Sequence, residues 1–117
     1  MAIAITTPQR GGFGWMVNGT SADASGCEQL LAAPAAGISI LISHLTINSA
    51  AGITITIGEG KTGAAVTTAL IGPVTFAANS SMQWDFPDGL LVTAATSLTV
   101  DSSGAGVICV FAWGKYV

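Results

Sequence analysis

The chain has 117 residues, a net charge of −3 and 50% hydrophobic residues, but only 8% of its residues are charged, against roughly 25% in an ordinary soluble domain. This length suits a single domain and excludes a second independent core. Because charged residues normally keep a monomer from associating, the deficit predicts an outer surface largely covered by other protein. The alternative is a monomer coated with Ser, Thr and Asn.

The scarce reactive residues exclude several kinds of partner. Arg10, Lys61 and Lys115 are the only cations and are far apart, whereas nucleic-acid binding uses clustered Lys and Arg. Every apolar run is too short for a membrane-spanning helix, and the first residues lack a signal-like segment, so we expect no membrane partner and synthesis in the cytoplasm. One histidine and two separated cysteines, Cys27 and Cys109, predict no metal site and no cofactor, and we expect the cysteines to be buried.

Residues 1–12 predict an N-terminal arm, followed by a single domain of residues 13–117. The sequence MAIAITTPQRGG alternates Ala and Ile, and then Pro8 and paired glycines separate it from the body. Such a segment can add as a strand to the open sheet edge of a neighbour, with Ile3 and Ile5 making the contact. The alternative is a frayed terminus.

The body reads as an all-β domain. Turn signals recur about every eight to twelve residues, and β-branched residues fill the runs between them. About eight or nine short strands of this kind predict an antiparallel β-sandwich of the jelly-roll type. The segment CEQLLAAPAAG is a helical alternative, limited by Pro34 to about two turns. The expected strands are 14–17, 28–32, 38–48, 53–57, 66–76, 82–86, 90–93, 97–101 and 107–113.

Side chains alternate across a strand, so the pattern within each run indicates its environment. Segment 53–57 places isoleucine on one face and threonine on the other, which is typical of a half-buried strand. Segment 107–113 is apolar on both faces, with Phe111 and Trp113 on one of them. In an antiparallel sandwich one face of a sheet meets the core, so this strand predicts a second covering layer, from a loop, an arm or a neighbouring subunit.

Segment 38–48 is also apolar on both faces, and it contains His44, which follows the face of Ile40 and Ile42. If that face is a subunit contact, His44 lies in it or at its rim. A catalytic histidine needs a nucleophile or a carboxylate within hydrogen-bond reach, and nothing nearby in sequence supplies one. We therefore expect a hydrogen-bonded strand histidine, no catalytic residue and no enzyme.

The segment MQWDFPDGLL is the densest polar and aromatic cluster. Trp84 beside Asp85 and Asp88 is a candidate sugar site, by ring stacking and hydrogen bonding, or a partial calcium site. The simpler interpretation is that FPDG forms a turn joining two strands, with Pro and Gly at the positions that a turn favours.

Three segments, ISHLTINSAAGITITIGEG, FPDGLLVTAATSLTVDSSGAG and VICVFAWGKYV, together resemble the small β-sandwich proteins of tailed bacteriophages that decorate or cement the head. The resemblance runs from about Ile38 onward and concerns strand order and turn placement. It implies a jelly-roll-like homotrimer on the outer capsid surface of the virion, made in the host cytoplasm. Such a protein binds the major capsid protein, stabilises contacts between its subunits and has no catalytic residues.

This resemblance suggests which residues make contacts, because aromatic anchors dominate interface energies. Ile3 and Ile5 are the expected capsid-contacting residues of the arm. The alternative function is a carbohydrate-binding or receptor-binding module of a phage fibre or tail, with Trp84, Asp85 and Asp88 at the sugar. The expected subunit-interface residues are Trp15, Ile40, Ile42, His44, Phe111, Trp113 and Tyr116.

Overall fold

The computed structural model describes residues 4–6, 14–22 and 26–117. These ranges contain strands and turns, so the helical alternative for CEQLLAAPAAG is wrong. Within the same ranges, no helix has the length and apolar character needed to cross a membrane.

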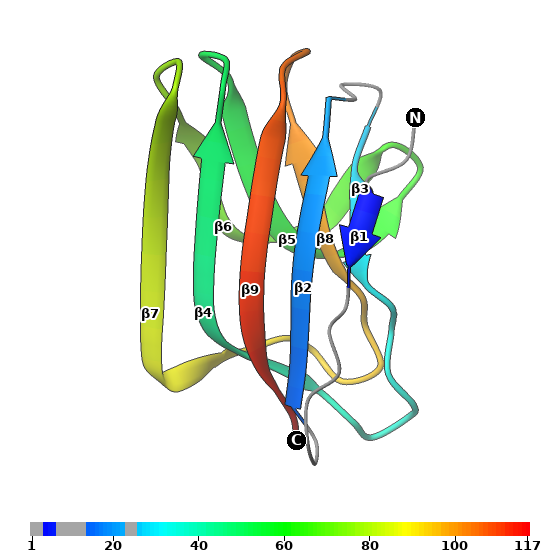
Figure 1. The fold of residues 1–117 in the computed structure, drawn as a ribbon. Helices are drawn as coiled ribbons and strands as arrows, with labels where there is room; N and C mark the ends of the chain where they lie inside the picture. The colour runs from blue at the N-terminus through cyan, green and yellow to red at the C-terminus, as the bar shows by residue number, and fades with distance from the viewer. Residues whose placement is uncertain (1–3, 7–13, 23–25) are drawn as a thin grey trace.

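Two antiparallel sheets pack face to face, as Figure 1 shows. Sheet A has the order β1-β2-β9-β4-β7, and sheet B has the order β3-β8-β5-β6. Apart from the three-residue β1, each sheet has four strands, so the expected all-β sandwich of two antiparallel sheets is confirmed. The strands are β1 (Ala4–Thr6), β2 (Gly14–Ser21), β3 (Glu28–Leu31), β4 (Ile40–Ser49), β5 (Thr54–Thr62), β6 (Ala65–Thr75), β7 (Ser80–Leu91), β8 (Leu98–Ser102) and β9 (Ile108–Tyr116).

The hydrophobic core lies between the sheets, and both sheets supply it with aliphatic side chains. Ile55 and Ile57 are buried in β5 while Thr54 and Thr56 are half-buried, as the alternation in this segment predicts. Each large apolar side chain that is fully buried contributes about 1.5–3 kcal/mol to folding. The fully buried side chains include Val17, Ile40, Ile42, Leu45 and Val110 from sheet A and Leu30, Ile57, Leu98 and Val100 from sheet B.

The FPDG sequence does not form the expected turn between two strands, because β7 continues through it. Ile42 of β4 pairs with Leu90, and His44 pairs with Asp85, so four residues of β7 lie opposite a single residue of β4. The residues that favour a turn therefore form a large bulge within one strand. Gly89 at its end has φ of 83°, a conformation that favours glycine.

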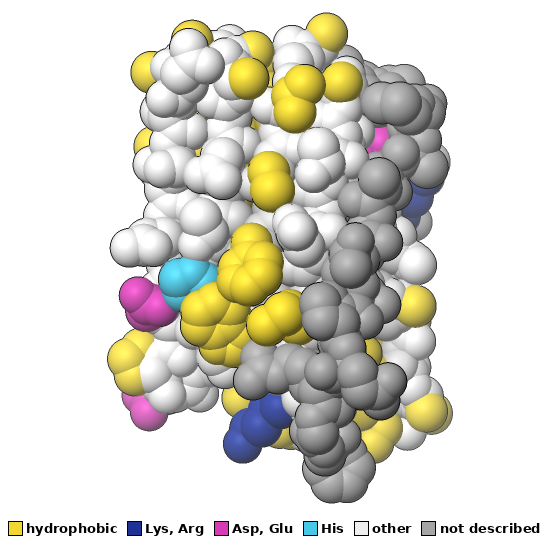
Figure 2. All heavy atoms as spheres, viewed as in Figure 1, with side chains coloured by type: hydrophobic (Ala, Val, Ile, Leu, Met, Phe, Trp, Pro, Cys, Tyr) yellow, Lys and Arg dark blue, Asp and Glu magenta, His cyan; other side chains and the backbone are white. Residues whose placement is uncertain are grey.

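An extra residue in β4 itself, between Ile42 and His44 in the pairing with β9, reverses the alternation of this strand. Ile40 and Ile42 lie in the core before the bulge, and Leu45 and Ile47 lie in the core after it. His44 is consequently on the outer face of sheet A, where Figure 2 shows it, and the prediction that it shares a face with Ile40 and Ile42 is wrong. Leu41, which is half-buried, is the apolar residue of β4 that lies on the outer face.

Candidate functional site

The outer face of sheet A carries rows of side chains that run across its strands. The register aligns Asp85 of β7, His44 of β4, Trp113 of β9 and Met16 of β2 in one row. Phe111 lies in the next row along β9. Figure 2 shows hydrophobic side chains gathered beside the histidine in the middle of this face. We call these five residues the aromatic cluster.

Both ring nitrogens of His44 have hydrogen-bond partners. Nδ1 lies 2.6 Å from Oδ1 of Asp85, and Nε2 lies 2.6 Å from Oγ1 of Thr46. An ionised carboxylate only accepts hydrogen bonds, so Nδ1 donates to Asp85, and in the neutral ring Nε2 accepts from the Thr46 hydroxyl. These two bonds fix the orientation of the ring. The expectation of a hydrogen-bonded strand histidine is thus confirmed, with a partner 41 positions away in sequence.

The hydrogen bonds link Thr46 to His44 and His44 to Asp85. This is the order of nucleophile, base and orienting acid in a catalytic triad. Acyl transfer also needs donors for an oxyanion and a cavity for the substrate. The backbone of β4 is paired on both sides, with β7 and with β9, and neither of the two hollows described below includes His44 or Thr46. The two hydrogen bonds hold the His44 ring in place.

The fixed histidine in turn positions Trp113. The two rings stack with centroids 4.1 Å apart and an interplanar angle of 13°, and Phe111 meets Trp113 edge-on at 5.5 Å. Aromatic contacts of this kind contribute about 0.5–1.5 kcal/mol each beyond the area that they bury. Ile108, Val110 and Ala112 of β9 are buried in the core, so the half-buried aromatic residues lie on the opposite face. The cluster is a rigid, partly apolar surface.

Three residues that we expected at a subunit interface lie instead inside the folded chain. Ile40 and Ile42 are fully buried, and Trp15 is only 5% exposed. Trp15 alternates with outward-facing Met16 in β2, and its Nε1 donates to the carbonyl of Lys115 at 3.2 Å. These side chains stabilise the core and are not available to a neighbour.

The three candidate sugar-binding residues do not form one site. Trp84 pairs with Leu45 and packs against the core, whereas the neighbouring side chain of Asp85 points outward and is 72% exposed. Asp88 lies in the bulge of β7 and is exposed. Of the two arm residues, Ile5 lies in β1, which pairs with β2 of the same chain, and Ile3 lies outside the described residues.

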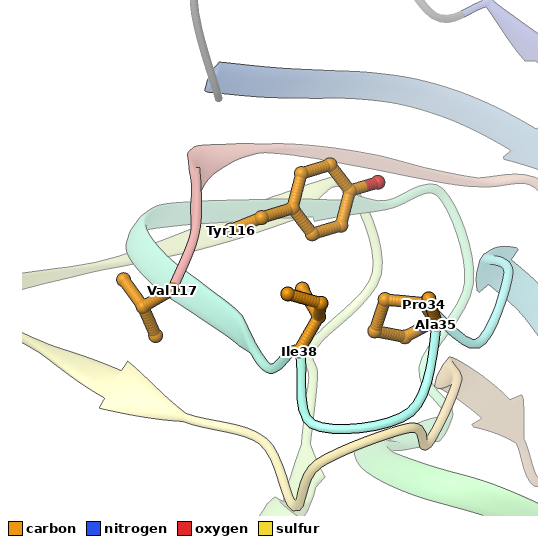
Figure 3. Close-up of a pocket in the computed structure, with 5 residues that line it drawn as sticks. All are labelled: Pro34, Ala35, Ile38, Tyr116 and Val117. Carbon is orange, nitrogen blue, oxygen red and sulfur yellow. The ribbon is translucent and has the colours of Figure 1, made fainter.

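Two hollows lie at the ends of the sandwich. The first is an apolar hollow of about 530 Å³ formed by Pro34, Ala35, Ile38, Tyr116 and Val117 (Figure 3). Burial raises the pKa of the Tyr116 phenol above its ordinary value. We expected Tyr116 at an interface, but the sequence did not indicate that the loop after β3 meets the end of β9.

The second hollow, which we call the polar hollow because Asn and Ser are most of its lining residues, measures about 380 Å³. It lies at the end of sheet A where β4 ends and where β7 and β9 begin. Its residues are Asn48, Ser49, Ala50, Asn79, Ser80, Ser81, Val107 and Cys109. The sequence signal for it was the turn segments NSAAG and AANSS, which we read only as connections between strands.

The cysteines are separate and unpaired with one another. Cys27 is buried, as expected, and burial raises the pKa of its thiol, an effect that the nearby Lys61 partly opposes. Cys109 is half-buried on the outer face of sheet A, and its thiol donates to Oδ1 of Asn18 at 3.4 Å. Across the described ranges, no group of three or more His, Cys, Asp and Glu residues is placed to hold a metal ion.

Comparisons with known proteins give no match: no protein family, no curated protein and no solved structure is similar to this chain.

Proposed function

We propose that this chain is a structural subunit that assembles through the outer face of sheet A, in the form of a homotrimeric decoration protein that binds the major capsid protein on the outside of a phage head. The observation that carries the proposal is the aromatic cluster. It places Trp113, Phe111 and Met16, each half-buried, on the outer face of sheet A, and Trp and other aromatic residues are enriched among the anchors of interfaces.

The rigidity of the cluster supports this role. A side chain that is already fixed loses little conformational entropy when a partner covers it, so less of the contact energy is lost on association. His44 is held by two hydrogen bonds and holds Trp113 by stacking. The charged residues Asp85, on β7, and Lys115, near the end of β9, lie at the margin of the aromatic cluster. Such a partly polar rim around an apolar centre is typical of interfaces.

The strand order supports assignment to the jelly-roll type. The antiparallel partners are β2 with β9, β3 with β8, β4 with β7 and β5 with β6. This is the order produced when one long hairpin is rolled up into two sheets, which we infer to be the jelly-roll arrangement of eight strands. Small proteins of this architecture build viral shells, and the resemblance in the sequence points to the decoration type.

The mass of the purified protein in solution tests the proposal. We expect a trimer by light scattering for the wild type and for the control Thr56→Ala, which truncates a half-buried residue on the outer face of sheet B. Trp113→Ala and Met16→Lys should both shift the mass toward the monomer and reduce binding to capsids. Met16→Lys keeps the ring stack and adds a charge, so it separates loss of the surface from loss of the fold.

A wild-type protein that stays monomeric at high concentration would contradict the proposal. An unchanged trimer mass in both variants would also contradict it, because the assembly would then use another face. The alternative function, a carbohydrate-binding or receptor-binding module, has less support at the residues first considered, since Trp84 and Asp85 lie on different faces of β7.

A further inference from the structure

The polar hollow is built by three connections that are cross-linked through their backbones. The amide of Ala50 donates to the carbonyl of Val107 at 2.9 Å, and the amide of Asn79 donates to the carbonyl of Ala50 at 3.3 Å. The β4–β5, β6–β7 and β8–β9 connections therefore support one another, and Figure 1 shows them side by side at one end of the sandwich. A hollow held in this way is formed before any ligand arrives.

Several polar side chains that line the hollow are available to a ligand. Ser49 and Ser80 use their hydroxyl groups as donors to the carbonyls of Ala51 and Ala77. Asn48, Asn79 and Ser81 are exposed, and within the described part of the chain their side chains have no hydrogen-bond partner. Asn48, Asn79 and Ser81 therefore offer two amides and one hydroxyl that face solvent.

Among the residues that the structure describes, the lining of the hollow has no charged side chain, which favours an uncharged ligand. Phosphate, sulfate and carboxylate ligands are bound by cations or by clustered N–H donors, and no described Lys or Arg lines the hollow. A carboxamide offers a donor and an acceptor together, which matches adjacent hydroxyl groups on a sugar ring. Val107, which is 50% exposed, and Ala50 add apolar surface for the C–H groups of such a ring.

We infer that this hollow binds a neutral carbohydrate, with Asn48, Asn79 and Ser81 as its hydrogen-bonding residues. The volume of about 380 Å³ falls within the ordinary range for small-ligand sites, about 300–1,000 Å³. The aromatic cluster is less suitable for a sugar, because His44 covers one face of the Trp113 ring. The inference goes beyond the proposed assembly role and is independent of it.

Saturation-transfer NMR with maltotriose, cellotriose and chitotriose, together with sialyllactose as a charged comparison, tests this inference. Asn48→Thr removes one amide and keeps a residue suited to a strand, and Asn79→Gly removes the other and suits the φ of 55° at this position. Gln29→Thr is the matched control, since it removes an exposed amide from β3 in the other sheet.

We expect at least one neutral trisaccharide to bind and each asparagine variant to weaken binding roughly five- to tenfold, as the loss of one or two hydrogen bonds does. The control should bind as the wild type does. Absence of transfer from all three neutral sugars, a preference for sialyllactose, or equal binding by the asparagine variants would overturn the inference. Light scattering on the same variants should show the wild-type mass, so failure of sugar binding and failure of assembly remain distinguishable.

Discussion

The two sheets are alike on their inner faces and different on their outer faces. Both fill the core with isoleucine, leucine and valine. None of the four strands that the structure assigns to sheet B contains an aromatic residue, whereas β9 of sheet A presents Phe111 and Trp113 outward. The outer face of sheet B carries threonine, including Thr54, whose hydroxyl lies 3.4 Å from that of Thr75.

This difference refines what the low content of charged residues implies. Threonine has a hydroxyl that bonds to water and a branched side chain that suits a strand, so sheet B can be hydrated with few charges. The contrast makes sheet A the candidate face for the proposed partner. Three experiments test the contrast between the two sheets.

The largest loss of stability is expected from Gly114→Ala, which would force β4 and β9 of sheet A apart. A methyl group at this position would overlap the carbonyl oxygen of Leu41, and it would lie 2.9 Å from Cζ2 of Trp15. Because backbone atoms cannot move aside within a paired sheet, we expect the free energy of unfolding to fall by about 3 kcal/mol, measured by urea denaturation. Gly52→Ala is the control, since the nearest atom there is 3.7 Å away. Equal stability of the two variants would show that the spacing of β4 and β9 is not as described.

An intermediate effect is expected in the reactivity of the two thiols. Cys109 is half-buried on the outer face of sheet A, whereas Cys27 is 2% exposed and burial raises its pKa. Iodoacetamide should therefore modify Cys109 at least about tenfold faster than Cys27, as peptide mass spectrometry can measure. If sheet A is the assembly face, modification of Cys109 should also slow as the protein concentration rises. Faster labelling of Cys27 would contradict the assignment of faces.

The smallest effect is expected at Asp101, which lies opposite Thr56 in sheet B. Burial raises the pKa of this carboxyl above its ordinary value of 3.8, so the folded chain binds the proton more tightly than the unfolded chain does. The contribution of Asp101 to stability is therefore greatest below the ordinary value and is lost as pH rises through the raised pKa. Asp101→Asn should remove this dependence and increase stability at neutral pH by on the order of 0.5 kcal/mol. The melting temperatures of the wild type and of Asp101→Asn, measured from below pH 3.8 to neutral pH, test this prediction. Parallel dependence of the two melting temperatures on pH would refute it.

Local patterns were sufficient for most of the fold. The alternation of isoleucine and threonine in β5 correctly predicted which side chains face the core, whereas the two apolar faces of β9 left the core face of that strand undecided. The bulge between β4 and β7 was not predictable in the same way, because Pro and Gly in FPDG favour a turn and a bulge alike. Only the pairing of His44 with Asp85 distinguishes the two outcomes, and that pairing depends on tertiary structure.

An extra residue in β4 explains what the sequence missed at the candidate site. Strict alternation assigned His44 to the face of Ile40 and Ile42, and the extra residue between Ile42 and His44 moves the histidine to the other face. Its carboxylate partner lies on a different strand, so a search of neighbouring positions was unable to identify it. Phe111 and Trp113 lie half-buried on the outer face of sheet A, and their role at a subunit interface stays a prediction.

The interruption of β7 also affects how copies of this chain can grow into larger structures. β7 forms one border of sheet A, and Pro87 lacks the N–H that an added strand would require there. A continuous ribbon of chains joined border to border is thereby disfavoured.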